Sequence, residues 1–94
     1  MSNAGADAGF VQSSKHRTAV VRRLYQSPAI PKTLKEDTNR EYSRISEALG
    51  DLKDEEIVEL LSPEERKKGR LYALTERGEE AWKFMLENNM VEED

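Results

Sequence analysis

The sequence predicts one mainly helical α+β domain with a small β-hairpin: three helices precede the hairpin and one follows it. The length of 94 residues is that of a single domain. Apolar residues recur at helical spacing over residues 14–26 and 41–54. Two short apolar runs, 57–61 and 70–74, flank a polar loop bounded by proline and glycine, as the strands of a hairpin do.

The first two helices are predicted from their ends. The first covers residues 14–26 and is capped by Ser14. It stops there because the residue before Pro28 avoids helical dihedral angles. The second covers residues 31–38, since Pro31 suits the first helical position. Their apolar residues, which we expect to be buried, are Val20, Val21, Leu24 and Leu34.

A third helix is expected over residues 41–54, after a tight turn at Asn39. Asparagine tolerates the left-handed backbone angles that such a turn requires. Gly50 lowers the helix propensity by about 1 kcal/mol relative to alanine, and the sequence gives no reason for it. The residues predicted to form the buried face, at i, i+3, i+7 and i+10, are Tyr42, Ile45, Leu49 and Leu52.

The hairpin is predicted from residues 57–61 and 70–74, joined by a loop that is longer than a tight turn. Thr75 is expected to cap the last helix. The resulting order is helix, helix, helix, strand, long loop, strand, helix. This is the order of a winged helix-turn-helix domain, in which the hairpin forms the wing.

The domain is expected to cover residues 10–90. Residues 1–9 are rich in glycine and alanine and are predicted to be a disordered tail, and residues 91–94 form an acidic end. No apolar run approaches the ~20 residues that a membrane span needs, and no signal peptide is evident. The chain has no cysteine, so disulfides and thiolate metal sites are excluded. We therefore expect a cytoplasmic protein.

Charge is distributed unevenly along the chain. The net charge is -4 and the pI about 5.1, which taken alone argues against binding to nucleic acid. However, residues 15–23 carry four bases and no acid, and residues 64–70 carry four bases and two acids. The acids are concentrated in residues 76–94, which contain seven acidic and two basic residues. The acidity is thus concentrated at the C-terminus, and the basic groups lie in the earlier part of the chain.

From about residue 10 to residue 86 the chain resembles the winged-helix transcription regulators of archaea and bacteria, of the broad ArsR/MarR-like class. Residues 30–52 resemble their helix-turn-helix, and residues 57–59 their first wing strand. Residues 68–78, KGRLYALTERG, are similar to a wing that ends in G-R-x-Y-x-L-T-x-x-G. The resemblance implies a dimeric DNA-binding protein.

Four positions depart from the family's pattern. Glycine usually stands at Asn39 and often at Glu56, a small residue at Lys35, and an apolar residue at Arg40. Lys35 and Arg40 must bring their charges to solvent while their aliphatic stems are buried.

The third helix is the expected recognition helix, because a helix fits the major groove and its exposed polar side chains read base edges. Arginine pairs bidentately with guanine, and glutamate accepts from cytosine. The candidate base contacts are Arg40, Glu41, Ser43, Arg44 and Glu47. The alternative is a solvated helix face with alternating charge.

Phosphate contacts are expected from the wing and from the start of the second helix, where backbone N–H groups are free. The candidates are Lys32, Thr33, Arg66, Lys67, Lys68 and Arg70. The alternative for the wing is a solubilising hairpin.

The last helix carries five large or apolar residues at positions 81, 82, 84, 85 and 86, more than one buried stripe requires. The surplus predicts a homodimer surface with Trp82, Met85 or Leu86 near the twofold axis.

No residue pattern supports catalysis, a cofactor or a metal, since His16 is the only histidine and no nucleophile–base pair is evident. No small-molecule ligand and no membrane partner are predicted. The sequence therefore favours a sequence-specific regulator that binds double-stranded DNA. The alternative is a winged helix that contacts other proteins, as an adaptor subunit, without binding DNA.

Overall fold

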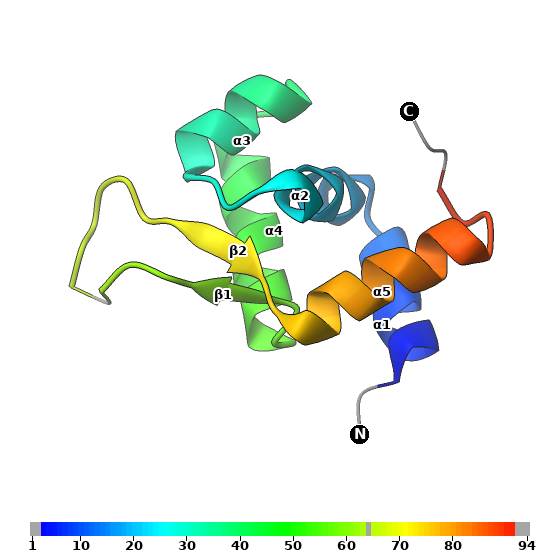
Figure 1. Cartoon of the computed structure of the whole chain (residues 1–94). Coiled ribbons are helices and arrows are strands. Elements are labelled where there is room, and N and C mark those ends of the chain that lie inside the picture. The colour runs from blue at the N-terminus through cyan, green and yellow to red at the C-terminus, as the bar shows by residue number, and fades with distance from the viewer. Residues whose placement is uncertain (1–2, 64, 92–94) are drawn as a thin grey trace.

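The computed structural model describes residues 3–63 and 65–91. Its elements follow one another as α1 (Ala4–Gln12), α2 (Lys15–Gln26), α3 (Pro31–Thr38), α4 (Tyr42–Asp54), β1 (Val58–Leu60), β2 (Tyr72–Leu74) and α5 (Glu76–Glu87). Figure 1 shows the hairpin between α4 and α5, with its loop reaching away from the helices. The predicted α+β winged helix-turn-helix fold is confirmed, with one additional helix, α1, in front of it.

The predicted helix ends are also confirmed. The Ser14 side chain caps α2 by accepting from the Arg17 amide, and Thr75 caps α5 by accepting from the Gly78 amide. Asn39 ends α3 in the left-handed region, with φ 55°. The chain therefore turns sharply from α3 into α4, as a helix-turn-helix requires.

The hairpin is short and is attached to the helix-turn-helix. β1 and β2 pair antiparallel, with Val58 opposite Leu74 and Leu60 opposite Tyr72. Tyr72 also exchanges two backbone hydrogen bonds with Ala29, of 3.0 and 2.9 Å, in the connection between α2 and α3. The base of the wing is thereby fixed against the start of α3.

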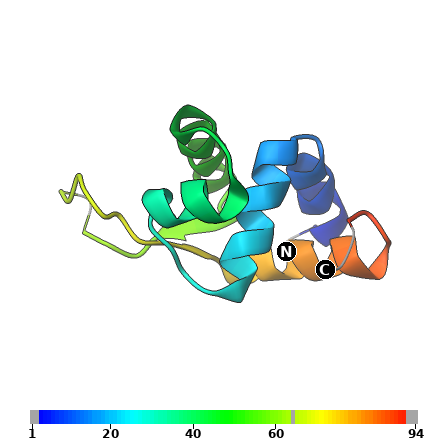
Figure 2. The same ribbon diagram turned by 90° about the horizontal axis from the view of Figure 1, so that it is seen from above.

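The core lies where α2 packs on α4 and is closed by α5 and the hairpin, as the view from above shows (Figure 2). Each element contributes buried side chains to this core. The largest of them are Leu34, Ile45, Leu52, Ile57, Met85, Val11, Val20, Val21 and Val58.

The N-terminal segment corrects the sequence prediction. Residues 4–9 were expected to be disordered, but they belong to α1, which the Asn3 side chain caps. Ala8 and Val11 are fully buried, and the buried Asp7 accepts two hydrogen bonds from Arg77 of α5, at 2.7 and 2.9 Å. Composition suggested disorder, whereas packing of α1 on α5 orders the segment. Residues 1–2 and residues 92–94 of the acidic end lie outside the described residues.

This packing also corrects the predicted dimer surface. Trp82 and Met85 are 3% and 0% exposed within one subunit, so they cannot form a dimer contact as they stand. The apolar surplus of α5 is covered by α1: a Cβ at Gly5 would lie 3.4 Å from the Phe84 ring. Leu86 alone of the three predicted residues is only partly buried.

Over the part of the chain that is described, none of the helices combines the length and apolarity needed to cross a bilayer.

Candidate nucleic-acid interface

The outer face of α4 is polar and open to solvent. Ile45, Ala48, Leu49 and Leu52 hold the helix on the domain, and the residues between them point outward. Four of the five predicted base contacts are exposed on this face or at its start: Glu41, Ser43, Arg44 and Glu47.

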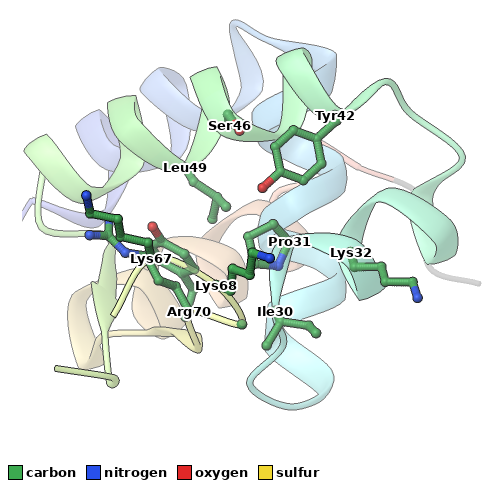
Figure 3. A pocket seen from close by; sticks show the side chains of 11 residues that line it. Ile30, Pro31, Lys32, Tyr42, Ser46, Leu49, Lys67, Lys68 and Arg70 are labelled. Carbon is green, nitrogen blue, oxygen red and sulfur yellow. The ribbon is translucent and has the colours of Figure 1, made fainter. Parts of the chain in front are cut away.

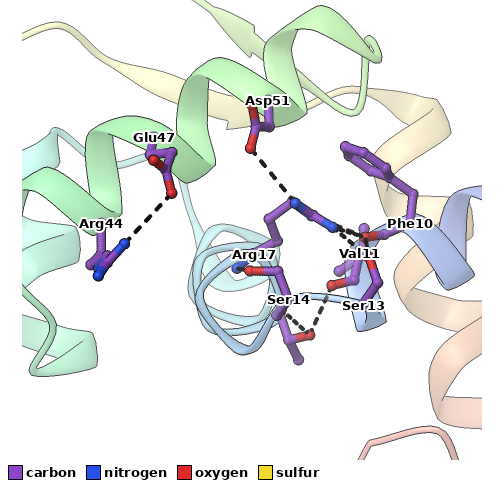
Figure 4. A network of polar contacts seen from close by, with 9 residues as sticks. Phe10, Val11, Ser13, Ser14, Arg17, Arg44, Glu47 and Asp51 are labelled. Carbon is purple, nitrogen blue, oxygen red and sulfur yellow. Dashed lines mark hydrogen bonds and ion pairs between the residues drawn. The ribbon is translucent and has the colours of Figure 1, made fainter.

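Arg44 and Glu47 form an ion pair, with Nη1 and Oε1 3.9 Å apart (Figure 4). Their side chains are 55% and 68% exposed, so water screens the attraction. An exposed pair at this spacing contributes about 0.2–0.5 kcal/mol to helix stability. It therefore holds Arg44 only weakly.

Arg40, the fifth candidate, is half-buried and held against α2. Its Nη1 lies 3.0 Å from His16 Nδ1. Because a guanidinium only donates, Nδ1 must accept, which leaves the imidazole neutral with its proton on Nε2. Partial burial, followed by the positive charges of Arg40, Arg44 and Lys15, lowers the pKa of His16, which favours the same neutral form.

A groove of about 400 Å³ separates α4 from the wing and the start of α3 (Figure 3). Lys32 reaches it from α3, and Lys67, Lys68 and Arg70 from the wing. The structure thus brings four of the six predicted phosphate contacts to one groove beside α4. The other two, Thr33 and Arg66, are not part of its lining, although the Arg66 carbonyl accepts a hydrogen bond from Arg70 Nε.

Tyr42 and Ser46 line the same groove from the side of α4, and the sequence did not indicate either as a site residue. Tyr42 was predicted to be buried with Ile45, but it is 54% exposed. It is the first residue of α4, three residues before the first buried position, Ile45, and its side chain lines the groove instead of the core. Its place beside the charged Arg40 and Glu41 was the signal that this helical turn faces water.

Arg17 fixes the position of α4 relative to α1 and α2. Its guanidinium donates to the Phe10 carbonyl at 2.9 and 2.8 Å, stacks over the Phe10 ring, and lies 3.6 Å from Asp51 of α4 (Figure 4). One side chain thus joins three helices.

Within the described ranges, 3–63 and 65–91, no cluster of three acidic or histidine side chains is placed to hold a metal ion.

Solved structures of regulators share this fold. RosR-S4, solved in a complex, is similar with a TM-score of 0.81 and 22% identity, over 94% of this chain and 78% of that one. NMB1585, a MarR family regulator from Neisseria meningitidis, has a TM-score of 0.71 and 20% identity over 82% of this chain. The homodimeric winged helix-turn-helix DNA-binding domain of Mb0332 from Mycobacterium bovis has a TM-score of 0.69 and 15% identity, over 93% of this chain and 78% of that one.

These similarities establish a winged-helix fold and confirm, at the level of the fold, the resemblance found in residues 30–78. This chain spans 55% of NMB1585 and 53% of ZitR from Lactococcus lactis, so both proteins contain more structure than this domain. No protein-family model and no curated protein matches the chain.

Proposed function

We propose that this protein is a sequence-specific transcription regulator that binds double-stranded DNA as a homodimer, with α4 in the major groove and the wing on the backbone. The observation that carries the proposal is the groove beside α4. Its lining contains four basic side chains and no acid among the described residues. A helix fits the major groove, and the phosphates then flank it where these cations lie.

The two surfaces have different tasks in this proposal. Lys32, Lys67, Lys68 and Arg70 neutralise phosphates and set the register, which contributes affinity without sequence preference. The exposed side chains of α4 read the bases. Glu41, which precedes α4, and Glu47, which lies on it, repel phosphate, so correct base contacts must contribute much of the affinity.

A dimer would present two α4 helices to two half-sites about one helical turn apart. Mb0332, which shares the fold, is described as homodimeric. Of the residues predicted for the dimer surface, Leu86 remains partly exposed on α5 and is the one that we propose lies at the twofold axis. The role is one of binding rather than catalysis and fits the cytoplasmic location expected from the sequence.

The proposal is tested by fluorescence anisotropy with a random-sequence duplex over a series of salt concentrations, followed by selection of preferred sites from a duplex library. We expect binding that weakens as salt rises and a selected site with twofold symmetry. If no duplex binds even at low salt, the winged helix acts as a protein-binding adaptor instead.

A further inference from the structure

Arg40 stands at the start of the proposed recognition helix, but its side chain is tied to another helix. It follows the left-handed turn at Asn39 and directly precedes Glu41, the N-cap residue of α4. The N-terminal residues of a recognition helix are those that reach the DNA. The Arg40 guanidinium instead lies against α2, with Nη1 3.0 Å from Nδ1 of His16. This hydrogen bond therefore connects α2 to the start of α4.

The position of the Arg40 side chain is only partly satisfied by hydrogen bonds. Its Nε is buried, and within the described part of the chain no acceptor binds it. A buried N–H donor without an acceptor lowers stability, so the Nη1 bond to His16 favours this position and the orphaned Nε opposes it. The Arg40 backbone is held separately, since its amide donates to the Lys35 carbonyl at 3.3 Å. The side chain can therefore leave α2 without opening the turn.

The hydrogen bond between Arg40 and His16 exists only while the imidazole is neutral. A guanidinium has no acceptor, so Nδ1 must accept, and a protonated imidazole has no free lone pair to do so. Protonation would also bring a second positive charge within hydrogen-bond distance of the guanidinium. One proton thus removes the acceptor and adds a repulsion, and both effects release Arg40.

The surroundings of His16 favour its neutral form at neutral pH. Partial burial is the largest cause of its lowered pKa, three cations add to it, and one acid opposes them. These charged groups come from α2 itself, from the turn and from α4: Lys15, Arg40, Arg44 and Glu47. Three further acids, on α1, α3 and α4, are each bound by another arginine: Asp7 by Arg77, Asp37 by Arg23 and Asp51 by Arg17. Arg40 is therefore held at neutral pH, and its release needs a pH below 6.5.

We propose that His16 is a positioning residue for Arg40: neutral His16 holds the guanidinium against α2, and protonated His16 releases it to a phosphate of bound DNA. The release follows from contacts within the free protein, whereas the use of Arg40 by DNA rests on the proposed function. A free guanidinium at the start of α4 attracts phosphate, so duplex binding tightens as His16 takes up its proton.

The first experiment follows the whole chain without DNA by nuclear magnetic resonance from pH 8 to pH 5. At pH 8 we expect the His16 ring proton on Nε2 and an Arg40 Nε–H that is protected from exchange, relative to its intrinsic rate at each pH. The protection should be lost with the same midpoint as the His16 titration, below pH 6.5. Arg23 Nε–H, which is bound to Asp37, is the internal control and should keep its protection.

Two variants separate positioning from a general effect of acid. In His16→Gln the amide oxygen still accepts from Arg40 but cannot titrate, so the protection of Arg40 Nε–H should persist down to pH 5. Arg40→Gln should raise the pKa of His16 toward 6.5, because it removes a cation that lowers it. Lys53→Gln is the matched control, since it removes an exposed charge of α4 that is not among those acting on His16.

The second experiment measures duplex affinity above and below the His16 midpoint at constant ionic strength. The wild type should bind about tenfold more tightly at the lower pH, the gain expected from one charge-assisted contact. His16→Gln should show no such gain, and Arg40→Gln should keep only the smaller part that comes from the charge of His16 itself. If no duplex binds at either pH, the proposed function fails, while loss of Arg40 protection in the free protein still supports the positioning role. The inference is overturned if Arg40 stays protected while His16 titrates, or if its release leaves the affinity for DNA unchanged.

Discussion

Gly78 of α5 rests on the backbone of Ile57: a Cβ at Gly78 would lie 2.2 Å from the Ile57 carbonyl oxygen. The same oxygen accepts a hydrogen bond from the Thr75 amide at 3.1 Å, and the Thr75 hydroxyl in turn accepts from the Gly78 amide at 3.0 Å. The first turn of α5 and the start of the wing are therefore in backbone contact. This explains why the motif that ends in L-T-x-x-G needs its last glycine.

Gly78→Ala should lower the free energy of unfolding by roughly 1–3 kcal/mol, because the methyl group meets backbone that cannot move aside as a side chain can. In a domain of this size each kcal/mol corresponds to about 4–8 °C in Tm, measured by circular dichroism. Gly50→Ala is the matched control. Apart from its chain neighbours and the backbone of α4 itself, no atom lies within 4 Å of its Cβ position, so it should raise stability by up to about 1 kcal/mol. Equal effects of both changes would contradict the close contact.

The helices from 14 onward and their caps were predictable because local rules determine them: a hydroxyl at Ser14 or Thr75, a proline at Pro31, an asparagine at Asn39. Positions where glycine is usual were informative too. Glu56 has a left-handed φ of 60°, which glycine would adopt without strain. Helical periodicity does not show which residues at the end of a helix are exposed, and Tyr42 was therefore wrongly predicted to be buried.

The role of α1 could not be predicted for a related reason. Its order depends on contacts far away in the sequence: Ala8 and Val11 are buried in the core, and Asp7 forms an ion pair with Arg77. The surplus apolar residues of α5 were interpreted as a dimer surface because the segment that covers them, α1, was predicted to lie largely in a disordered tail. The spacing of Ala4, Ala8 and Val11, with Asn3 before them, was the local sign of a helix. The basic residues that line the groove beside α4 were predicted from the sequence, but Tyr42 and Ser46 were not.

The wing is expected to act on all duplexes alike. Lys67→Ala and Lys68→Ala should each weaken binding regardless of sequence and flatten the salt slope by about one, since each removes one phosphate contact. Anisotropy titrations between low and physiological salt measure the slope, with Lys53→Ala as the control of equal charge. Slopes that match the wild type would show that the wing does not touch the backbone.

His16 should make stability depend on pH. Its pKa in the folded protein is lowered by partial burial and by Arg40, so between that value and the ordinary 6.5 the unfolded chain binds more protons. The free energy of unfolding is therefore highest above pH 6.5 and decreases as the pH falls through the lowered pKa. Urea titrations from pH 8 to pH 5 measure this.

His16→Gln is the test variant, because an amide oxygen still accepts from Arg40 but does not titrate. Its stability should change less over the same pH range, and His16 is the only histidine in the sequence. A wild type and a variant with the same pH profile would rule out His16 as the titrating group.

If the dimer forms through Leu86, substitutions at Leu86 and at Trp82 should have different effects. Leu86→Glu should give folded monomers, because the side chain is only partly buried within the subunit, and these should bind DNA poorly since the two half-sites are no longer engaged together. Trp82→Glu should instead unfold the subunit, because it places a charge in the core. Light scattering and circular dichroism distinguish the two results. A wild type that is monomeric at micromolar concentration would refute the dimer.

Arg44 is predicted to read a base. It is exposed on the outer face of α4, beside Ser43, and its ion pair with Glu47 on the same helix is worth about 0.2–0.5 kcal/mol. A bidentate contact with guanine discriminates by about 1–3 kcal/mol, so the correct base would draw Arg44 out of the ion pair.

Arg44→Ala should therefore remove the preference at one base pair in each half-site, a loss of roughly 5- to 150-fold in discrimination, while fold and dimer remain. Site selection from a duplex library on wild type and variant measures the preference, with circular dichroism and light scattering as controls. Glu47→Ala is the matched variant, because it frees Arg44 without removing it and should keep the preference at that position. If wild type and Arg44→Ala select the same bases equally well, Arg44 contacts no base, and the specificity must come from other residues of α4.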